Sequence, residues 1–169
     1  FGDAATATAL EHAPGAPPMS FEMGSDGAGH RAIIIEAGGQ RVPFAAHHLE
    51  RLPGADGIAR KGTDVILDGP AILNFSIREV PPLVTRLLDG SSRTAEDVDH
   101  FVFHQANRMI NETIRKKLGL PVEKVPMSLH DFGNTSSASV PVTMTVRLRE
   151  QLTAGPQTLM LAGFGVGLS

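Results

Sequence analysis

The sequence contains no cysteine among its 169 residues. This absence excludes disulfide bonds and thiolate zinc sites, and no reaction through a cysteine nucleophile can run on this chain alone. A strong charge of either sign is missing too: 15 Lys and Arg stand against 18 Asp and Glu, a formal net charge of −3. Without a net basic field, we expect no binding to nucleic acid.

Long apolar runs are also absent. The longest, residues 159–168, has ten residues, too few to span a bilayer. Phe1-Gly2-Asp3 lacks the basic and apolar regions of a signal peptide, and without an initial Met we expect a start that has been cut or processed. The composition, 41% apolar and 20% charged, is typical of one globular domain with a core.

Short apolar or alternating runs predict strands. They lie at residues 4–10, 32–35, 100–104 and 158–162, and a further strand is expected before Gly133. Residues 43–68 have a mixed pattern that predicts no element. The order of strands and helices along the chain is typical of an α/β domain with a mostly parallel sheet packed between helices.

Helical periodicity appears in three stretches. The first covers residues 72–88, is expected to kink at Pro81-Pro82, and ends at Asp89-Gly90. The second, residues 107–118, is amphipathic, with a Glu112–Lys116 pair predicted on its surface. Its predicted inward face consists of Met109, Ile110, Thr113, Ile114 and Leu118. The third helix follows Gly133 and ends near residues 155–156.

Three polar or glycine-rich loops follow predicted strands, and their chemistry suggests a shared site. They are residues 104–107, 133–136 and 163–167, and His104, Asn134 and Phe164 lie thirty residues apart in turn. Strand ends on one side of an open α/β sheet converge on one crevice. A neutral histidine and an asparagine are uncharged hydrogen-bond donors, as an enolate or oxyanion requires, and a glycine turn adds backbone N–H groups.

These loops resemble a known family. His104-Gln105-Ala106-Asn107, Gly133-Asn134-Thr135-Ser136-Ser137-Ala138-Ser139 and Gly163-Phe164-Gly165-Val166-Gly167-Leu168-Ser169 look like the C-terminal half of β-ketoacyl-ACP synthase III. Phe1-Gly2-Asp3 resembles the family's Phe-Gly-Asp-Gly strand that follows the catalytic cysteine. The likeness covers nearly the whole chain and is weakest over residues 11–68.

The resemblance implies a thiolase-like fold of two similar α/β halves, with residues 1–169 forming one half-domain and the cysteine half missing. It also implies a decarboxylative Claisen condensation, in which an acyl group passes from acyl-CoA to a cysteine and is attacked by malonyl-ACP after loss of CO₂. No cofactor or metal is implied. The implied partners are acyl carrier protein, acyl-CoA, the N-terminal half and a second copy of the complete enzyme, in the cytoplasm.

The resemblance also assigns residue roles. His104 and Asn134 match the pair that stabilises the malonyl thioester enolate, Val166 gives a backbone N–H to the acyl oxyanion, and Phe164 matches the aromatic residue beside the nucleophile. The implied pantetheine contacts are Gly69, Leu73, Ala106 and Asn107. The implied ACP contacts are Gln105, Ala106, Asn107, Arg108, Met109, Arg115 and Lys116.

Some residues depart from the family pattern. Asp3-Ala4-Ala5-Thr6 replaces an Asp-Gly-Ala-Gly run, and Met109 stands where the family often has Arg, with Arg108 one place earlier. The chain also ends at Ser169, where the family continues into a last strand.

Other interpretations of the same residues stay open. Asn134 can be a helix N-cap, and residues 115–117 can be a solvated basic helix end. The pair His47-His48 with Glu50, and His100 with His104, are weak metal patterns. The whole chain can also be a cysteine-free scaffold subunit of a heteromeric condensing enzyme, or a CoA- or ACP-binding module without chemistry.

Overall fold

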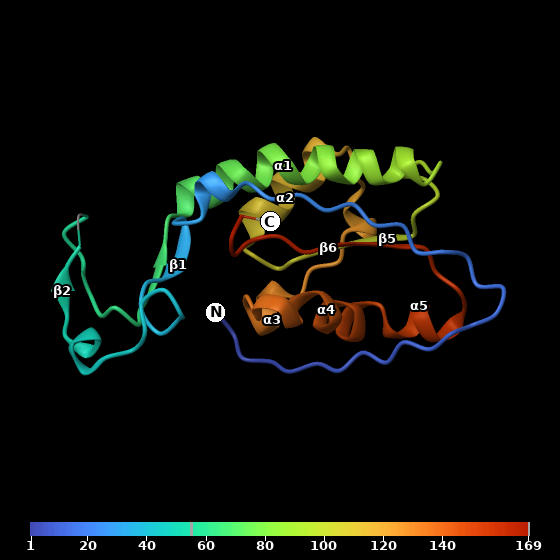
Figure 1. Cartoon of the computed structure of the whole chain (residues 1–169). Helices are drawn as coiled ribbons and strands as arrows, with labels where there is room; N and C mark the ends of the chain where they lie inside the picture. The colour runs from blue at the N-terminus through green and yellow to red at the C-terminus, as the bar shows by residue number, and fades with distance from the viewer. Residues whose placement is uncertain (55, 169) are drawn as a thin grey trace. The chain divides into compact units, whose positions relative to one another are not determined.

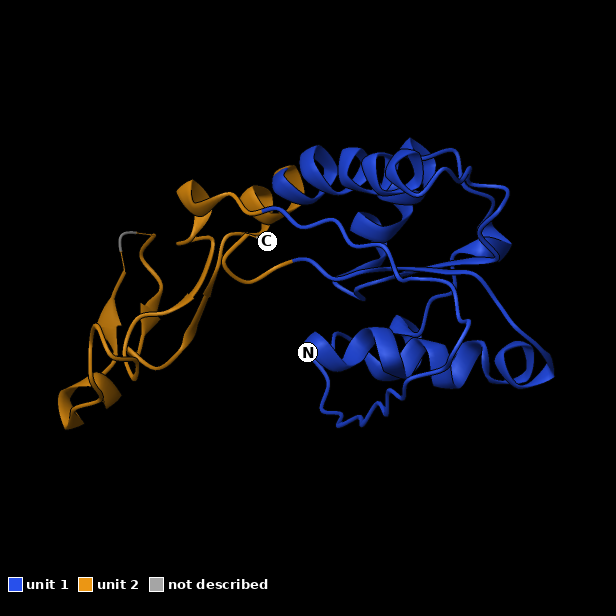
Figure 2. Cartoon of the chain, turned by 45° about the vertical axis from the view of Figure 1, so that its right-hand side comes forward, with its two compact units in different colours: residues 1–24, 75–164 blue, residues 25–74, 165–169 orange. Residues whose placement is uncertain are grey.

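The computed structural model describes residues 1–54 and 56–168 (Figure 1). Ser169, the last residue of the predicted glycine-rich motif, lies outside the described residues. The chain divides into two compact units (Figure 2), each described by itself: unit 1 is residues 1–24 and 75–164, and unit 2 is residues 25–74 and 165–169. That residues 1–169 form one half-domain stays a prediction.

Unit 1 is built on two parallel strands, β5 (His100–Phe103) and β6 (Leu159–Ala162), in a register that pairs Phe103 with Ala162. Parallel strands require a long crossover, and residues 104–158 supply one that contains helices. Figure 1 shows the strand pair between α1 and α2 on one side and α3, α4 and α5 on the other. The helices are α1 (Gly69–Gly90, of which residues 75–90 lie in unit 1), α2 (Arg108–Lys117), α3 (Leu129–Phe132), α4 (Ser139–Arg147) and α5 (Arg149–Ala154), with 3-10 turns η3 (Val122–Lys124) and η4 (Ser136–Ala138).

The core of unit 1 lies around β5. Phe101, Val102 and Phe103 are fully buried, and Ile110 and Ile114 of α2 are buried as well. A strand buried on both faces shows a continuous apolar run rather than alternation, which is why residues 100–104 were predictable as a strand. Met109 is an exception to the predicted inward face of α2, because it is exposed.

Both ends of α2 have well-defined caps. The Asn107 side chain accepts a hydrogen bond from the Ile110 N–H at 2.8 Å, an N-cap. At the other end the Leu120 N–H donates to the Arg115 carbonyl, the Gly119 N–H donates to the Lys116 carbonyl, and Gly119 has φ +66°. These bonds form a Schellman motif, which favours glycine at its left-handed position.

Pro81 and Pro82 lie inside α1, which continues through them from Gly69 to Gly90. Because Pro81 has no N–H, the Ile77 carbonyl loses its helical donor. The Lys117 ammonium donates to this carbonyl at 2.9 Å. A side chain from α2 thus replaces the missing bond.

Unit 2 contains two antiparallel strand pairs, so the prediction of a mostly parallel sheet is wrong for the described residues. β1 (Ile33–Ile35) pairs with β4 (Val65–Leu67), and β2 (Leu52–Pro53) pairs with β3 (Ala59–Arg60). The connection between β2 and β3 is too short for the crossover that parallel strands require, so this pair must be antiparallel. Three of the four lie in residues 43–68, where no element was predicted. Unit 2 also holds 3-10 turns η1 (Gly27–Gly29) and η2 (Ala46–Leu49).

Two strand predictions in unit 1 are wrong. Residues 4–10 are exposed and outside any strand, because a strand needs a neighbouring ladder and no backbone bond joins them to one among the described residues. The segment before Gly133 forms the short helix α3 instead of a strand.

Asn111 of α2 gives a stability prediction. Its side chain is fully buried, and neither amide atom has a hydrogen-bond partner among the described residues. We expect Asn111→Leu to raise the free energy of unfolding by about 1–3 kcal/mol, because a buried unpaired amide is replaced by an apolar group with the same branching. Urea unfolding followed by circular dichroism measures this.

The exposed Lys116 of the same helix provides the matched control. Lys116→Leu should change the free energy of unfolding by no more than about 0.5 kcal/mol. A destabilised Asn111→Leu would contradict the prediction.

Candidate active site

His104 lies at the carboxyl end of β5, where its backbone N–H donates to the Ala162 carbonyl of β6 at 2.7 Å. The side chain is half-buried. Its ring packs edge-on against Phe164, with ring centroids 5.5 Å apart and an interplanar angle of 86°. On another side, Nδ1 lies 2.8 Å from the Ser139 Oγ at the start of α4. Strand pairing and two side-chain contacts therefore fix the imidazole.

Burial determines the charge of this imidazole. Desolvation lowers the pKa of His104 below its ordinary value of 6.5, and a hydrogen bond to the Ser136 backbone opposes the shift without reversing it. His104 is therefore mainly neutral at pH 7. A neutral ring carries one N–H donor and one acceptor nitrogen.

Asn134 lies on the loop between α3 and η4. Gly133 precedes it with φ +64° and ψ −158°, a conformation that essentially only glycine adopts. The Asn134 Oδ1 accepts the Ser136 N–H at 2.9 Å, so the side chain caps this turn, and the Asn134 carbonyl accepts the Gly2 N–H at 2.8 Å. With its oxygen occupied by Ser136, the Asn134 amide keeps its NH₂ group as a donor.

Ser136 connects the two predicted catalytic residues. Its backbone N–H bonds to Asn134, and its backbone also forms the hydrogen bond to His104. Ser136 itself has φ +54°, a left-handed conformation uncommon for a residue with a side chain. Ser136, in this uncommon backbone conformation, therefore lies between the side chains of the two predicted catalytic residues.

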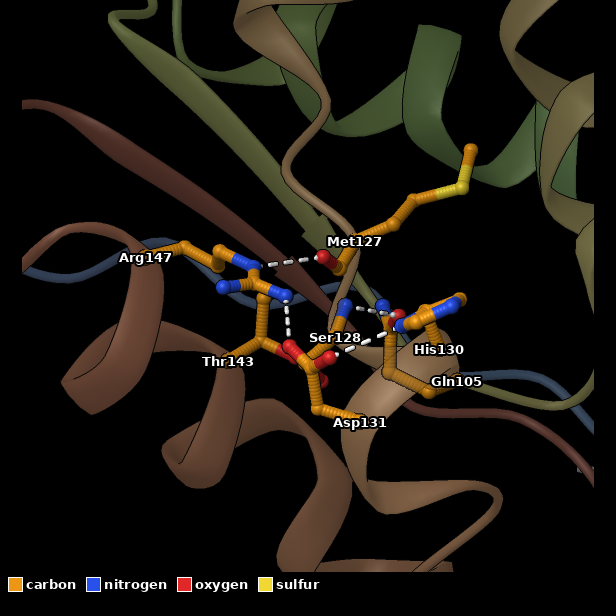
Figure 3. A network of polar contacts seen from close by, with 7 residues as sticks. All are labelled: Gln105, Met127, Ser128, His130, Asp131, Thr143 and Arg147. Carbon is orange, nitrogen blue, oxygen red and sulfur yellow. Dashed lines mark hydrogen bonds and ion pairs between the residues drawn. The ribbon is translucent and has the colours of Figure 1, made fainter.

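Arg147 of α4 anchors the segment that leads into this loop. Its Nε donates to the Met127 carbonyl at 2.8 Å, and its guanidinium pairs with Asp131 of α3, which also contacts His130 (Figure 3). Hydrogen bonds from His130 and from Arg147 lower the pKa of Asp131. Charge pairing therefore holds α3 against α4 just before Gly133.

Gln105 corrects a prediction for acyl-carrier contacts. It is fully buried, its Nε2 donates to the Phe103 carbonyl at 2.8 Å, and its Oε1 accepts the Ser128 N–H at 2.9 Å. Both ends of the amide are thus used inside the protein, and the side chain has no surface to offer a partner.

The other residues predicted to meet a carrier protein divide into two sets. Asn107, Arg108, Met109 and Lys116 are exposed, and Ala106 is half-buried. Arg115 is instead engaged within α2: its guanidinium donates to the Leu120 carbonyl and pairs with Glu112. This pair replaces the predicted Glu112–Lys116 pair.

Three predicted site residues lie in unit 2 or its part of α1. Gly69 is exposed and Leu73 is half-buried at the start of α1. Val166 is exposed in a tight turn closed by the bond from the Leu168 N–H to the Gly165 carbonyl. Their predicted roles stay predictions.

Several buried polar residues at the site were not predicted. Ser139, Thr143 and Ser128 are almost completely buried and lie directly behind His104 and Gln105. The only available signal was that Ser139 and Thr143 are four residues apart, one helical turn, in an otherwise apolar stretch.

The described residues contain neither a cluster of metal ligands nor a membrane-spanning helix. Within residues 1–54 and 56–168, no three His, Asp or Glu side chains gather as metal ligands. In the same part of the chain, no helix combines the length and the apolar character that crossing a bilayer requires.

Comparisons with known proteins agree on one family. The profile described as "3-Oxoacyl-[acyl-carrier-protein (ACP)] synthase III C terminal" matches residues 88–169. The β-ketoacyl-[acyl-carrier-protein] synthase III of Symbiobacterium thermophilum is 35% identical over 169 residues, which are 99% of this chain and 48% of that protein. The chain spans about half the length of such relatives.

Solved structures give the same result. A 3-oxoacyl-(acyl-carrier-protein) synthase III at 2.1 Å matches with a TM-score of 0.76 and 36% identity, over 86% of this chain and 43% of that chain. The 3-oxoacyl-(acyl-carrier protein) synthase of Burkholderia xenovorans matches with a TM-score of 0.74 and 39% identity, over 86% and 40%. The chain therefore matches the C-terminal half of members of the β-ketoacyl-[acyl-carrier-protein] synthase III family.

Proposed function

We propose that this chain supplies the enolate-stabilising half of a condensing enzyme that joins an acyl group to malonyl-ACP. The supporting observation is that Ser136 links two uncharged polar side chains, Asn134 and the mainly neutral His104, whose ring packs against Phe164. Uncharged, fixed donors stabilise developing negative charge without titrating near pH 7.

In the proposed reaction, a cysteine of the N-terminal half first takes the acyl group from acyl-CoA as a thioester. The bond between the malonyl methylene and its carboxylate then breaks, CO₂ leaves, and the electron pair moves onto the thioester oxygen as an enolate. His104 and Asn134 donate hydrogen bonds to this oxygen. The enolate carbon attacks the acyl thioester, a C–C bond forms, and the cysteine thiolate leaves.

The lack of cysteine makes this chain dependent on the other half. We propose that the exposed Asn107, Arg108, Met109 and Lys116 meet the pantetheine arm and the acidic carrier protein, while Val166 completes the acyl oxyanion site. The complete enzyme is proposed to be a cytoplasmic homodimer. The intact mass of the natural protein under denaturing conditions tests whether a cysteine-containing half accompanies this chain. A species of about twice 17.9 kDa, or a second chain with cysteine, supports a condensing enzyme. A single 17.9 kDa species favours the scaffold or binding-module alternatives.

His104→Ala and Asn134→Ala should separate the two half-reactions. In the complete enzyme, each substitution should lower malonyl decarboxylation by roughly 10²- to 10³-fold, the usual effect of removing one oxyanion donor. Cysteine acylation from acyl-CoA should stay largely intact, because it does not use the enolate site. Release of CO₂ and transfer of labelled acyl group measure the two steps.

The exposed His12 offers a matched control, and His12→Ala should leave both rates unchanged. Equal loss of both half-reactions in a folded His104→Ala enzyme would reject the assigned role.

The lowered pKa of His104 predicts a pH dependence of stability. Below pH 6.5 the unfolded chain takes up a proton at this histidine that the folded chain resists, so the free energy of unfolding falls as pH drops from 6.5 toward the lower folded pKa. Above pH 6.5 the His104 ring is neutral in both states, so its titration no longer lowers the free energy of unfolding. His104→Asn should remove this part of the pH dependence.

Urea unfolding at a series of pH values, with His12→Asn as the control, measures the difference. The control curve should run parallel to the wild-type curve, because the His12 side chain is exposed and lies outside the core. Identical pH dependence in wild type and His104→Asn would contradict the lowered pKa.

A further inference from the structure

Behind the His104 ring lies a hydroxyl that the proposed reaction does not touch. The Ser139 side chain is almost completely buried, with its Oγ 2.8 Å from the His104 Nδ1. The same Oγ accepts a hydrogen bond from the Gln105 backbone N–H at 3.2 Å. Ser139 therefore meets the imidazole and the peptide that follows it.

Among the described residues, the Ser139 hydroxyl has one acceptor to which it can donate its proton. An N–H can only donate, so the bond from Gln105 occupies a lone pair of Oγ and leaves its O–H free to donate. Among the described residues, the only other hydrogen-bond partner of Oγ is the His104 Nδ1. With Nδ1 accepting this proton, the neutral ring carries its own proton on Nε2, and the hydrogen bond to the Ser136 backbone is then donated by this N–H.

A chain of buried hydrogen bonds holds Ser139 in this orientation. The Thr143 hydroxyl donates to the Ser139 carbonyl at 2.8 Å, so the Ser128 hydroxyl, 2.7 Å away, donates to Thr143. The Ser128 N–H in turn donates to the Gln105 Oε1 at 2.9 Å. Figure 3 shows the Gln105, Ser128 and Thr143 part of this chain. Because these residues are buried and use their polar atoms within the chain, the network leaves Ser139 little freedom to rotate.

We propose that Ser139 is a positioning residue that keeps the Nδ1 of His104 as an acceptor and its Nε2 as the donor. This inference rests on the proposed function, because it states how His104 becomes a donor to the enolate oxygen. Ser139 itself touches no reacting atom. The orienting partner of a functional histidine usually determines its tautomer and affects its activity in this way.

The first test is nitrogen NMR of ¹⁵N-histidine-labelled wild-type protein at a pH where His104 is neutral. We expect the Nε2–H tautomer with a hydrogen-bonded Nδ1. In Ser139→Ala the Nδ1 resonance should move toward that of a free acceptor nitrogen, and Ser139→Thr, which keeps the hydroxyl, should restore it. The exposed Ser137 of the same loop provides the control, because Ser137→Ala should leave the His104 resonances unchanged.

The second test is kinetic and uses the complete enzyme. Ser139→Ala should lower kcat for malonyl decarboxylation by about 10- to 100-fold, as loss of an orienting partner does elsewhere, with KM and cysteine acylation nearly unchanged. A shifted Nδ1 resonance in an enzyme that never decarboxylates malonyl thioesters would reject the proposed function and retain the role of Ser139.

Two results would overturn the inference. One is the finding that His104 of the wild-type protein carries its proton on Nδ1. This measurement does not depend on whether any variant folds. The other is a folded Ser139→Ala enzyme with unchanged decarboxylation and an unchanged Nδ1 resonance.

Discussion

The parallel pairing of β5 with β6 is the constraint on which the candidate site depends. The fully buried Phe101 and Phe103 hold β5 in the core, and the last ladder bond runs from the His104 N–H to the Ala162 carbonyl. His104 is therefore the first residue beyond a rigid strand, and Phe164 lies two residues beyond the end of its partner. A side chain at this position is held in a well-defined place, since strand pairing and burial together fix its backbone.

The polar residues behind the site have a different physical role from the apolar core. Gln105, Ser128, Ser139 and Thr143 are buried but use their polar atoms in hydrogen bonds to one another and to the backbone. A buried hydroxyl or amide is costly when unpaired and directional when paired. This network thus connects the end of β5 to the starts of α3 and α4, which flank the Asn134 loop. By contrast, Asn111 is buried without a partner among the described residues.

The three consecutive basic residues near the end of α2 have different contacts in the structure. Lys and Arg in the last turn of a helix are expected to be solvated and to complement its dipole. Arg115 instead closes the helix end through the Leu120 carbonyl, and Lys117 replaces the bond that Pro81 removes from α1. Lys116 stays exposed. No pattern in the sequence distinguishes these three neighbours, because each assignment depends on what lies opposite the helix.

The sequence by itself determined the likeness to the family, both strands of the parallel pair, α2, and the identity of the loops that carry His104 and Asn134. These features depend on local periodicity and on motifs, which can both be recognised along the chain. Tertiary structure decided that residues 4–10 do not form a strand and that the sheets of unit 2 are antiparallel, because a strand exists only through its neighbour. It also decided that Gln105 faces inward and that Ser139 lies against His104, since residues 34 and 35 positions apart meet only when α4 packs beside β5.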